Sequence, residues 1–158
     1  MSAFGTIRMA TDEDVPAIAR LVNEAFLAED FIVGDRTNAE QLRELMRKGT
    51  FFLLEEAGAL IASIYTEVRG ERGYFGMLAV EPSRQGTGCG RRMIEEVERR
   101  SKIAGCRMMD LKVLSPRTNL LPIYQKLGYE ISGREEFHNT RPLKGVTECY
   151  CILMSKAL

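Results

Sequence analysis

The chain has 158 residues, of which 45% are hydrophobic and 28% are charged. This length predicts a single domain over residues 1–158 with its own core, and the composition excludes disordered, collagen-like and coiled-coil proteins. The 22 basic residues balance the 22 acidic ones, so the overall charge gives no reason to expect a nucleic acid or an anionic membrane as partner.

The sequence shows no recognisable targeting or membrane segment. No apolar run approaches the roughly 18 residues that a membrane span requires. Residues 1–6 have neither the basic start nor the long apolar stretch of a secretory signal. We therefore expect a cytoplasmic protein that has no membrane partner and is either a monomer or a homodimer.

The four cysteines are Cys89, Cys106, Cys149 and Cys151. Because no export signal is visible, we expect free thiols rather than a disulfide framework. Cys149 and Cys151 stand two apart in an expected strand, as small core residues do. A single histidine and the lack of a Cys-x-x-Cys pair argue against a metal site.

The first half of the chain predicts a strand, two helices and three further strands. Apolar residues recur at helical spacing from Val15 to Phe26, directly after a run of capping and acidic residues. The segment Tyr74–Val80 is almost entirely apolar, which is typical of a strand buried on both faces. Residues 29–37 form an irregular connector. The expected elements are strand 6–9, helix 13–27, helix 39–47, and strands 50–55, 60–68 and 74–80.

The second half begins with an amphipathic helix that ends at Gly105, a residue common just after helices. The expected elements are helix 91–104, strand 108–114, a short helix 120–126, strand 129–132, a polar loop 133–145 and strand 147–154. This order, with hairpin strands first and crossovers later, indicates a mixed α/β domain.

A glycine-rich loop, Gln85–Arg91, lies between the apolar strand and the amphipathic helix. Glycines let a backbone approach a phosphate closely, and the first N–H groups of a helix have no partner within it. Arg91 and Arg92 could add charge-assisted hydrogen bonds. The pattern therefore predicts an anion-binding site, with a plain flexible turn as the alternative.

Two common phosphate-binding motifs do not fit this loop. A P-loop requires Gly-Lys-Ser/Thr, whereas Gly90 is followed by two arginines. The dinucleotide fingerprint requires a third glycine at the position that Arg91 occupies.

The pattern Gln85-x-x-Gly88-x-Gly90 resembles the pyrophosphate loop of the GNAT superfamily of acetyl-CoA-dependent N-acetyltransferases. The preceding strand, Gly76–Pro82, and the later block Leu120–Tyr129 stand at the distances typical of that family. The resemblance extends over roughly residues 6–156. It implies a mixed, mostly antiparallel sheet of about six to seven strands flanked by helices, in which a splayed central strand pair binds acyl-CoA.

The resemblance also implies acetyl-CoA as cosubstrate and gives roles to individual residues. The strand end at Leu78 would pair with the pantetheine arm and polarise the thioester carbonyl. Asn119 lies five residues before Tyr124 rather than the seven common in the family, so it either contacts the pantetheine arm or caps the helix. The implied acetyl-CoA-binding residues are Leu78, Ala79, Val80, Gln85, Gly86, Thr87, Gly88, Cys89, Gly90, Arg91, Asn119 and Tyr124.

The implied reaction is direct attack of a primary amine on the thioester. Tyr124 would hydrogen-bond the leaving thiolate, or it is simply a core aromatic residue. Glu67 could accept the amine's proton through a water, or it is an exposed charge at a strand end. Asp30 and His138 are weaker candidates, and for His138 the alternative is a solvated loop histidine.

The acceptor pocket is expected from three irregular segments: Phe26–Arg36, the turn after Glu67, and Gly133–Gly145. Apolar walls could come from Phe31, Tyr65, Phe137 and Tyr150. Acidic residues (Glu29, Asp30, Asp35) could attract a cationic amine, and Arg36 or Arg141 an acidic acceptor. The acceptor itself stays open between a small amine, a protein N-terminus and a lysine side chain. A non-catalytic CoA-binding sensor or scaffold is the competing function.

Overall fold

The computed structural model describes residues 5–138 and 141–158, and within them the strands form one seven-stranded sheet in the order β1-β2-β3-β4-β5-β7-β6. Neighbouring strands are antiparallel except for β4 and β5, which are parallel. This confirms the predicted mixed, mostly antiparallel sheet. The strands are β1 Thr6–Met9, β2 Thr50–Glu56, β3 Ala59–Arg69, β4 Arg72–Val80, β5 Met108–Leu114, β6 Glu130–Glu136 and β7 Tyr150–Ala157.

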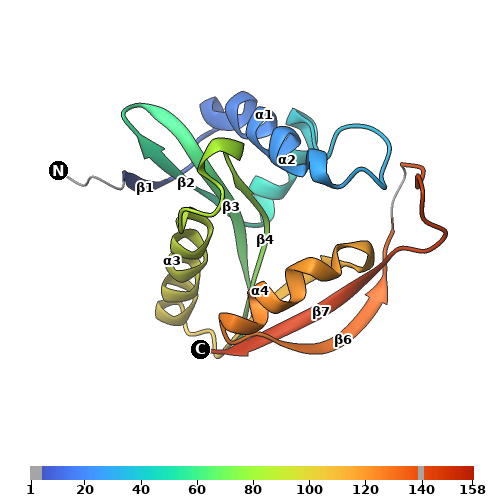
Figure 1. Cartoon of the computed structure of the whole chain (residues 1–158). Helices are drawn as coiled ribbons and strands as arrows, with labels where there is room; N and C mark the ends of the chain where they lie inside the picture. Colours follow the sequence, from blue (N-terminus) through green and yellow to red (C-terminus); the bar gives the residue numbers. More distant parts are fainter. Residues whose placement is uncertain (1–4, 139–140) are drawn as a thin grey trace.

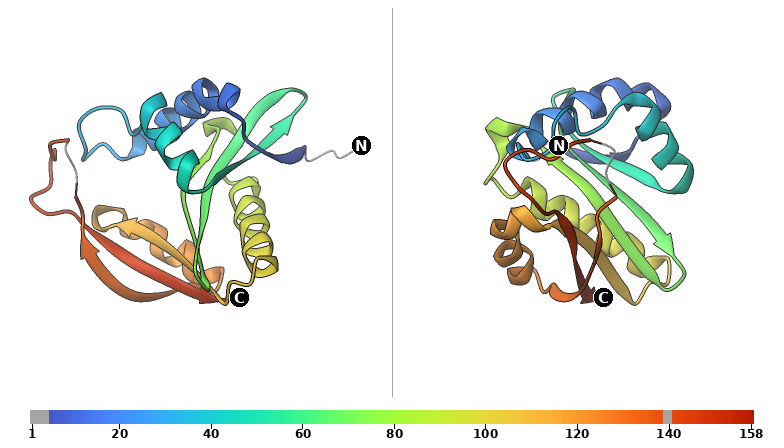
Figure 2. Two further views of the ribbon diagram at one scale, coloured as in Figure 1. Left: turned by 180° about the vertical axis from the view of Figure 1, so that it is seen from behind. Right: turned by 90° about the vertical axis from the view of Figure 1, so that its right-hand side faces the viewer.

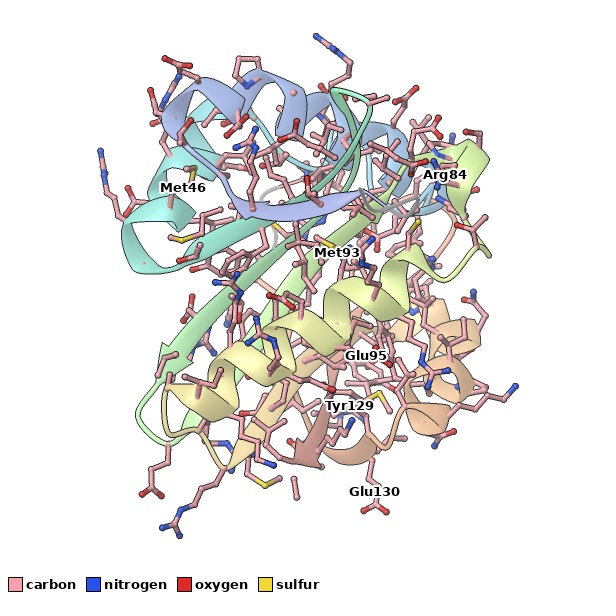
Figure 3. The ribbon with its side chains drawn as sticks, turned by 90° about the vertical axis from the view of Figure 1, so that its left-hand side faces the viewer. Met46, Arg84, Met93, Glu95, Tyr129 and Glu130 are labelled. Carbon is pink, nitrogen blue, oxygen red and sulfur yellow. The ribbon has the colours of Figure 1, made fainter. Side chains whose placement is uncertain are left out.

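Helices cover both faces of the sheet (Figure 1). The helices are α1 Val15–Ala25, α2 Ala39–Lys48, α3 Cys89–Ile103 and α4 Leu121–Lys126. α1 and α2 share one buried cluster with the sheet, whereas α3 and α4 contribute to the other. Figure 3 looks onto α3, where the fully buried Met93 lies between the helix and the sheet. The helical spacing of apolar residues therefore places two helix pairs on opposite faces.

The main differences from the predicted bounds are at α1, β6 and β7. α1 ends at Ala25, where a 3-10 helix (Phe26–Ala28) replaces the last expected turn. β6 continues to Glu136 through residues predicted as loop, because an edge strand can be polar on both faces while its backbone pairs with β7. β7 begins at Tyr150 and runs to Ala157, so Cys149 precedes the strand and does not share it with Cys151. Residues 139–140 of the predicted loop lie outside the described residues.

β4 and β5 separate soon after they begin. In the described part of the chain they pair only at Arg72–Met108, Gly73–Met109 and Tyr74–Asp110. Beyond this point β5 stays paired with β7 along its whole length, and β4 with β3. Figure 1 shows the two arms of the sheet meeting near the C-terminus and diverging from there, and Figure 2 shows the same divergence from behind. The expected splayed central strand pair is therefore present.

No helix among the described residues is long and apolar enough to cross a membrane.

Arg8 on β1 joins three separate parts of the fold. Its guanidinium donates to both carboxylate oxygens of Asp14, at 2.7 and 2.9 Å, and to Glu55 on β2. The hydrogen bond from Arg8 lowers the pKa of Asp14 to about 2, against a smaller opposing effect of burial. The ionised Asp14 carboxylate therefore stabilises the fold. This stabilisation is complete above the pKa of about 4 that the group has in the unfolded chain, and it is lost as the pH falls toward 2.

We expect Arg8→Gln to lower the free energy of unfolding at neutral pH by about 1 kcal/mol, since the ion pair is partly exposed but bidentate. The variant should also lose less stability than the wild type between about pH 4 and pH 2. Urea unfolding across this pH range measures both effects. Arg43→Gln, which removes an ion pair to the well-exposed Asp12, is the control and should change little. If the free energy of unfolding fell equally with pH in the wild type and in Arg8→Gln over this acidic range, this account would be contradicted.

Candidate active site

The opened edge of β4 contains a bulge. Met77 and Leu78 stand opposite the single residue Ile64 of β3, and Met77 has a φ of +50°, in the left-handed region that non-glycine residues rarely adopt. On the other side, the stretch 75–80 has no partner on β5 within the described residues. Backbone N–H and C=O groups seek partners when they are removed from water. This edge can therefore pair with an extended amide chain.

The glycine loop continues directly from this edge. The Gln85 side-chain amide donates to the Val80 carbonyl oxygen at 3.2 Å, which braces the loop against the end of β4. Gly86 has a φ of +78° and Gly88 a φ of +90°. A Cβ added at either would meet no described atom within 4 Å. The space over both glycines is therefore open to a ligand that approaches the backbone closely.

Gly88 is the N-cap of α3, and its carbonyl oxygen accepts the first helical hydrogen bond, from the Arg92 N–H at 3.0 Å. The N–H groups of Cys89, Gly90 and Arg91 therefore have no acceptor within the helix. They lie at the positive end of the helix dipole, which favours an anion. Among the described residues, the N–H groups of 86–88 make no backbone hydrogen bond either.

The arginine side chains next to the loop are engaged elsewhere. Arg91 donates to Glu95 at 2.9 Å, one turn further along α3. Arg92 donates to the carbonyl oxygen of Gly5 at 3.0 Å. The backbone N–H groups of the loop therefore remain as donors for an anion, whereas both guanidinium groups already have partners in the chain.

Tyr124 on α4 packs against the opened strand. Its ring centroid lies 6.3 Å from that of Phe75 on β4 and 6.3 Å from that of Tyr129. Burial raises the pKa of Tyr124; the charge of Arg117 lowers it and that of Glu29 raises it further. The phenol is therefore protonated at neutral pH. Its hydroxyl makes no hydrogen bond to a described residue, so it is available as a donor.

Asn119 is exposed in the 3-10 helix Ser115–Leu120, which precedes α4. The N-cap of α4 is Leu120, without a side-chain cap hydrogen bond among the described residues. The alternative that Asn119 caps this helix is therefore wrong. Pro122 in the first turn of α4 supplies a preset φ in place of a capping side chain.

Glu67 lies in a compact polar cluster on β3. Its carboxylate accepts hydrogen bonds from the Tyr65 hydroxyl at 2.5 Å and from Arg69, and its side chain is 13% exposed. The alternative of an exposed strand-end charge is therefore wrong. Burial raises the pKa of Glu67, but the hydrogen bonds from Arg69 and Tyr65 outweigh it and hold the pKa below its ordinary value. Glu67 is thus ionised, with both oxygens engaged.

Two of the three expected pocket segments come together. The connector between α1 and α2 meets the loop between β6 and β7: Val33 N–H donates to the Pro142 oxygen at 3.0 Å, and Lys144 N–H donates to the Phe31 oxygen at 2.7 Å. Figure 1 shows both segments at the same end of the molecule. They enclose a cavity of about 330 Å³ lined by Asn23, Phe26, Leu27, Glu29, Asp30, Ile32, Val33, Gly34, Asp35, Arg36, Arg141 and Lys144.

A second cavity of about 510 Å³ adjoins the first and shares Asp35, Arg36 and Arg141 with it. Phe137 and His138 also line it, as expected from the sequence, and the His138 side chain is 84% exposed. The turn after Glu67 lines neither cavity. Phe31 and Tyr65 are buried core residues instead.

Glu29 is the pocket residue whose burial the sequence does not reveal. Its side chain is 8% exposed and accepts a hydrogen bond from Arg117 at 3.3 Å. Burial raises its pKa, against the opposing charges of Arg36, Arg117 and Arg141. The sequence analysis grouped it with Asp30 and Asp35 as an acidic turn residue. Nothing in the local pattern distinguishes it, because Arg117 lies 88 positions away.

All four cysteines lie within the described residues and are free thiols, three of them buried. The expectation of free thiols is confirmed. No group of three or more His, Cys, Asp or Glu residues in the described part of the chain is arranged to hold a metal ion.

A splayed strand pair that leads into a glycine loop at a helix start is the architecture implied above for acetyl-CoA-dependent acetyltransferases. Residues 10–142 match the family model of the acetyltransferase (GNAT) domain. The chain belongs to this family, and the resemblance stated from the sequence is confirmed.

Curated relatives carry acetyltransferase names. An acetyltransferase of Sodalis glossinidius is 31% identical over 81 residues, covering 51% of this chain and 57% of the relative. The amino-acid acetyltransferase of Azotobacter vinelandii is 30% identical over 140 residues, covering 87% of this chain and 30% of the relative. The chain thus matches little more than half of the first relative's length and less than a third of the second's.

Solved structures share the fold at low identity. The ribosomal-protein-S18-alanine N-acetyltransferase from Escherichia coli has a TM-score of 0.75 and 18% identity, with 96% of this chain and 92% of that chain covered. A Salmonella typhimurium structure solved with its cofactor acetyl-CoA has a TM-score of 0.71 and 20% identity, with 97% and 93% covered. At these identities the likeness establishes the fold alone.

Proposed function

We propose that the chain is a single-domain N-acetyltransferase, spanning 1–158, that transfers the acetyl group of acetyl-CoA to a primary amine of a small molecule or peptide. The observation that carries this proposal is the opened β4–β5 pair leading into the glycine loop at the start of α3. The amino-acid acetyltransferase that matches 87% of this chain supports it, as does the acetyl-CoA-containing structure with the same fold.

Two adjoining surfaces fit two parts of acetyl-CoA. The unpaired edge of β4 offers alternating N–H and C=O groups to the amides of the pantetheine arm. The loop offers a row of backbone N–H groups and a helix terminus to the pyrophosphate. The open space over the loop glycines leaves room for close approach. The proposed contact residues are Leu78, Ala79, Val80, Gln85, Gly86, Thr87, Gly88, Cys89, Gly90, Arg91, Asn119 and Tyr124.

The proposed reaction is a direct transfer. A neutral amine nitrogen attacks the thioester carbonyl carbon, a C–N bond forms, and the C–S bond breaks as its electron pair leaves on sulfur. The proton that the acylated nitrogen then loses is taken up by the thiolate, which gives the amide and the CoA thiol. The backbone N–H of Leu78, in the bulge of β4, polarises the carbonyl oxygen. The Tyr124 hydroxyl donates a hydrogen bond to the thiolate as it leaves. Full proton transfer is uphill, because an ordinary thiol has a pKa of about 8.5 and a phenol about 10.

The amine must first lose a proton. At pH 7 only about one alkylamine in 2,500 is neutral, given an ordinary pKa of about 10.4. We assign Glu67 as the group that receives this proton through a water. Its pKa lies below the ordinary value, which makes it a weak base. Desolvation of the amine in the pocket, which lowers the pKa of an ammonium group, must therefore contribute as well.

Release of free CoA thiol tests the proposal. Wild-type protein is incubated with acetyl-CoA and a panel of primary amines, and the acetylated product is identified by mass spectrometry. We expect turnover with at least one class of amine. Acetyl-CoA binding without turnover on any amine would contradict the enzyme and favour a CoA-binding sensor or scaffold. Failure to bind acetyl-CoA by calorimetry would overturn both.

A further inference from the structure

The cavity between the α1–α2 connector and the β6–β7 loop holds a carboxylate oxygen that lacks a hydrogen bond. Glu29 Oε2 accepts from Arg117 at 3.3 Å, but Glu29 Oε1 is buried without a hydrogen-bond partner among the described residues. The side chain is more than nine-tenths buried, at 8% exposed. A buried charged acceptor without a donor is unfavourable. Arg36 Nε stands 3.9 Å away, beyond hydrogen-bond distance, so this oxygen can accept from an N–H donor of a ligand.

Arg36 lies beside this oxygen and is the complementary group. Its Nε is 3.9 Å from Glu29 Oε1, and its guanidinium lies over the Phe26 ring at 5.4 Å from the centroid. It donates no hydrogen bond to any described residue, and its side chain is 33% exposed. A guanidinium carries five donors in a planar fork suited to a carboxylate. Arg36 thus has donors available for a ligand in the cavity.

Arg117 ties the cavity to the opened sheet. It lies in the 3-10 helix Ser115–Leu120, which directly follows the opened end of β5, and its guanidinium donates to Glu29 at 3.3 Å. Glu29 and the neighbouring Arg36 therefore lie beside the opened end of the splay.

Arg141 brings a second positive charge to the same cavity. Its guanidinium donates to the carbonyl oxygens of Gly34 and Asp35, which fastens the β6–β7 loop to the connector. Burial and the charge of Arg36 lower the pKa of Arg141, while the charges of Glu29 and Asp35 raise it. Both guanidinium groups line the cavity, so a ligand carboxylate beside them gains from two positive charges.

We infer that the acceptor is an amino acid or a similar zwitterion whose carboxylate lies next to its amine. Its amine N–H donates to Glu29 Oε1, and its carboxylate accepts from the Arg36 guanidinium in the field of Arg141. In an α-amino acid the two groups are one carbon apart, which suits a carboxylate and a guanidinium that are near neighbours. A plain alkylamine would give Arg36 no anion beyond Glu29, whose oxygen lies outside hydrogen-bond distance. This inference rests on the proposed acetyltransferase function.

Matched pairs of acceptors test the inference. Each α-amino acid is assayed beside its primary amide, which keeps the side chain and the amine but lacks the carboxylate. The amide has the less basic amine, so reactivity alone favours it. We expect wild-type kcat/KM to favour the acids by about 10- to 100-fold, as a charge-assisted hydrogen bond would give. Equal or faster turnover of the amides would overturn the inference and leave the acetyltransferase function intact.

Two variants test whether Arg36 is the residue that causes the preference for acids. Arg36→Gln should remove the preference, by raising KM for the acids about 10- to 100-fold more than KM for the amides. Arg47→Gln, which alters an exposed ion pair on α2, is the control and should keep the preference. An acid preference that survives in Arg36→Gln would overturn the assignment of this residue. Turnover of neither acids nor amides, nor of any other amine, would overturn the proposed function and the inference together.

Discussion

Tyr124→Phe is expected to lower kcat by about 100-fold or more, as loss of one hydrogen-bond donor to developing negative charge usually does. Burial raises the pKa of Tyr124, so the hydroxyl remains a donor throughout the neutral range, and the variant removes that donor while keeping the ring against Phe75. Acetyl-CoA affinity should change little, because the hydrogen bond strengthens only as negative charge develops on sulfur. Steady-state rates and calorimetry separate the two quantities.

Tyr129→Phe is the matched control for this experiment. Tyr129 lies next to Tyr124, but its hydroxyl donates to Glu98 at 2.6 Å, and Glu98 also accepts from Lys156 at 3.1 Å. Removing this hydroxyl should lower the free energy of unfolding by about 1–3 kcal/mol and leave kcat near that of the wild type. If Tyr124→Phe had unaltered kcat, or if both variants lost turnover equally, Tyr124 would have no special role in the reaction.

Gly88→Val is expected to weaken acetyl-CoA binding by about 10- to 100-fold. Gly88 adopts a φ of +90° at the N-cap of α3, and its missing side chain leaves the backbone donors open. Valine would place branched carbons in the space assigned to the pyrophosphate and would block hydrogen bonds to a charged group, each contributing about 1.5–3 kcal/mol. The left-handed backbone would also be strained by about 1–2 kcal/mol.

Gly58→Val is the control that separates the effect of backbone strain from the effect of blocking the proposed pyrophosphate site. Gly58 has a φ of +80° in the β2–β3 turn, and a Cβ there would also meet no described atom within 4 Å. This variant should lose similar stability in urea unfolding and retain acetyl-CoA affinity in calorimetry. Equal affinity in both variants would remove the glycine loop from the binding site.

The sequence predicted the fold well because the patterns that specify it are local. The helical spacing in α1 and the apolar run of β4 both follow from a few neighbouring residues. β6 was underestimated because Gly133–Glu136 carry no apolar alternation, and their pairing with β7 is a property of the assembled sheet. The start of β7 was misplaced for a related reason, since Cys149 is apolar but lies outside the ladder.

The glycine loop was recognisable from the sequence because it is continuous in the chain, whereas the pocket was predicted only as segments, two of which meet in the structure. Glu29 is buried by residues that come from the opposite end of the sequence, such as Arg117. The charge of Glu29 is visible in the sequence, but its burial is not. The bulge at Met77 is likewise hidden, because a left-handed φ at a methionine follows from register with β3 and not from the residue type.

The engagement of Arg91 with Glu95, and of Arg92 with the Gly5 carbonyl, has a consequence for the proposed anion site. Uncharged backbone amides would provide its donors. Raising the ionic strength should therefore lower the affinity for a diphosphate less here than at a site built from guanidinium groups. Substitutions of the side chains around the loop should then change diphosphate affinity little, provided that the glycines of the loop are kept.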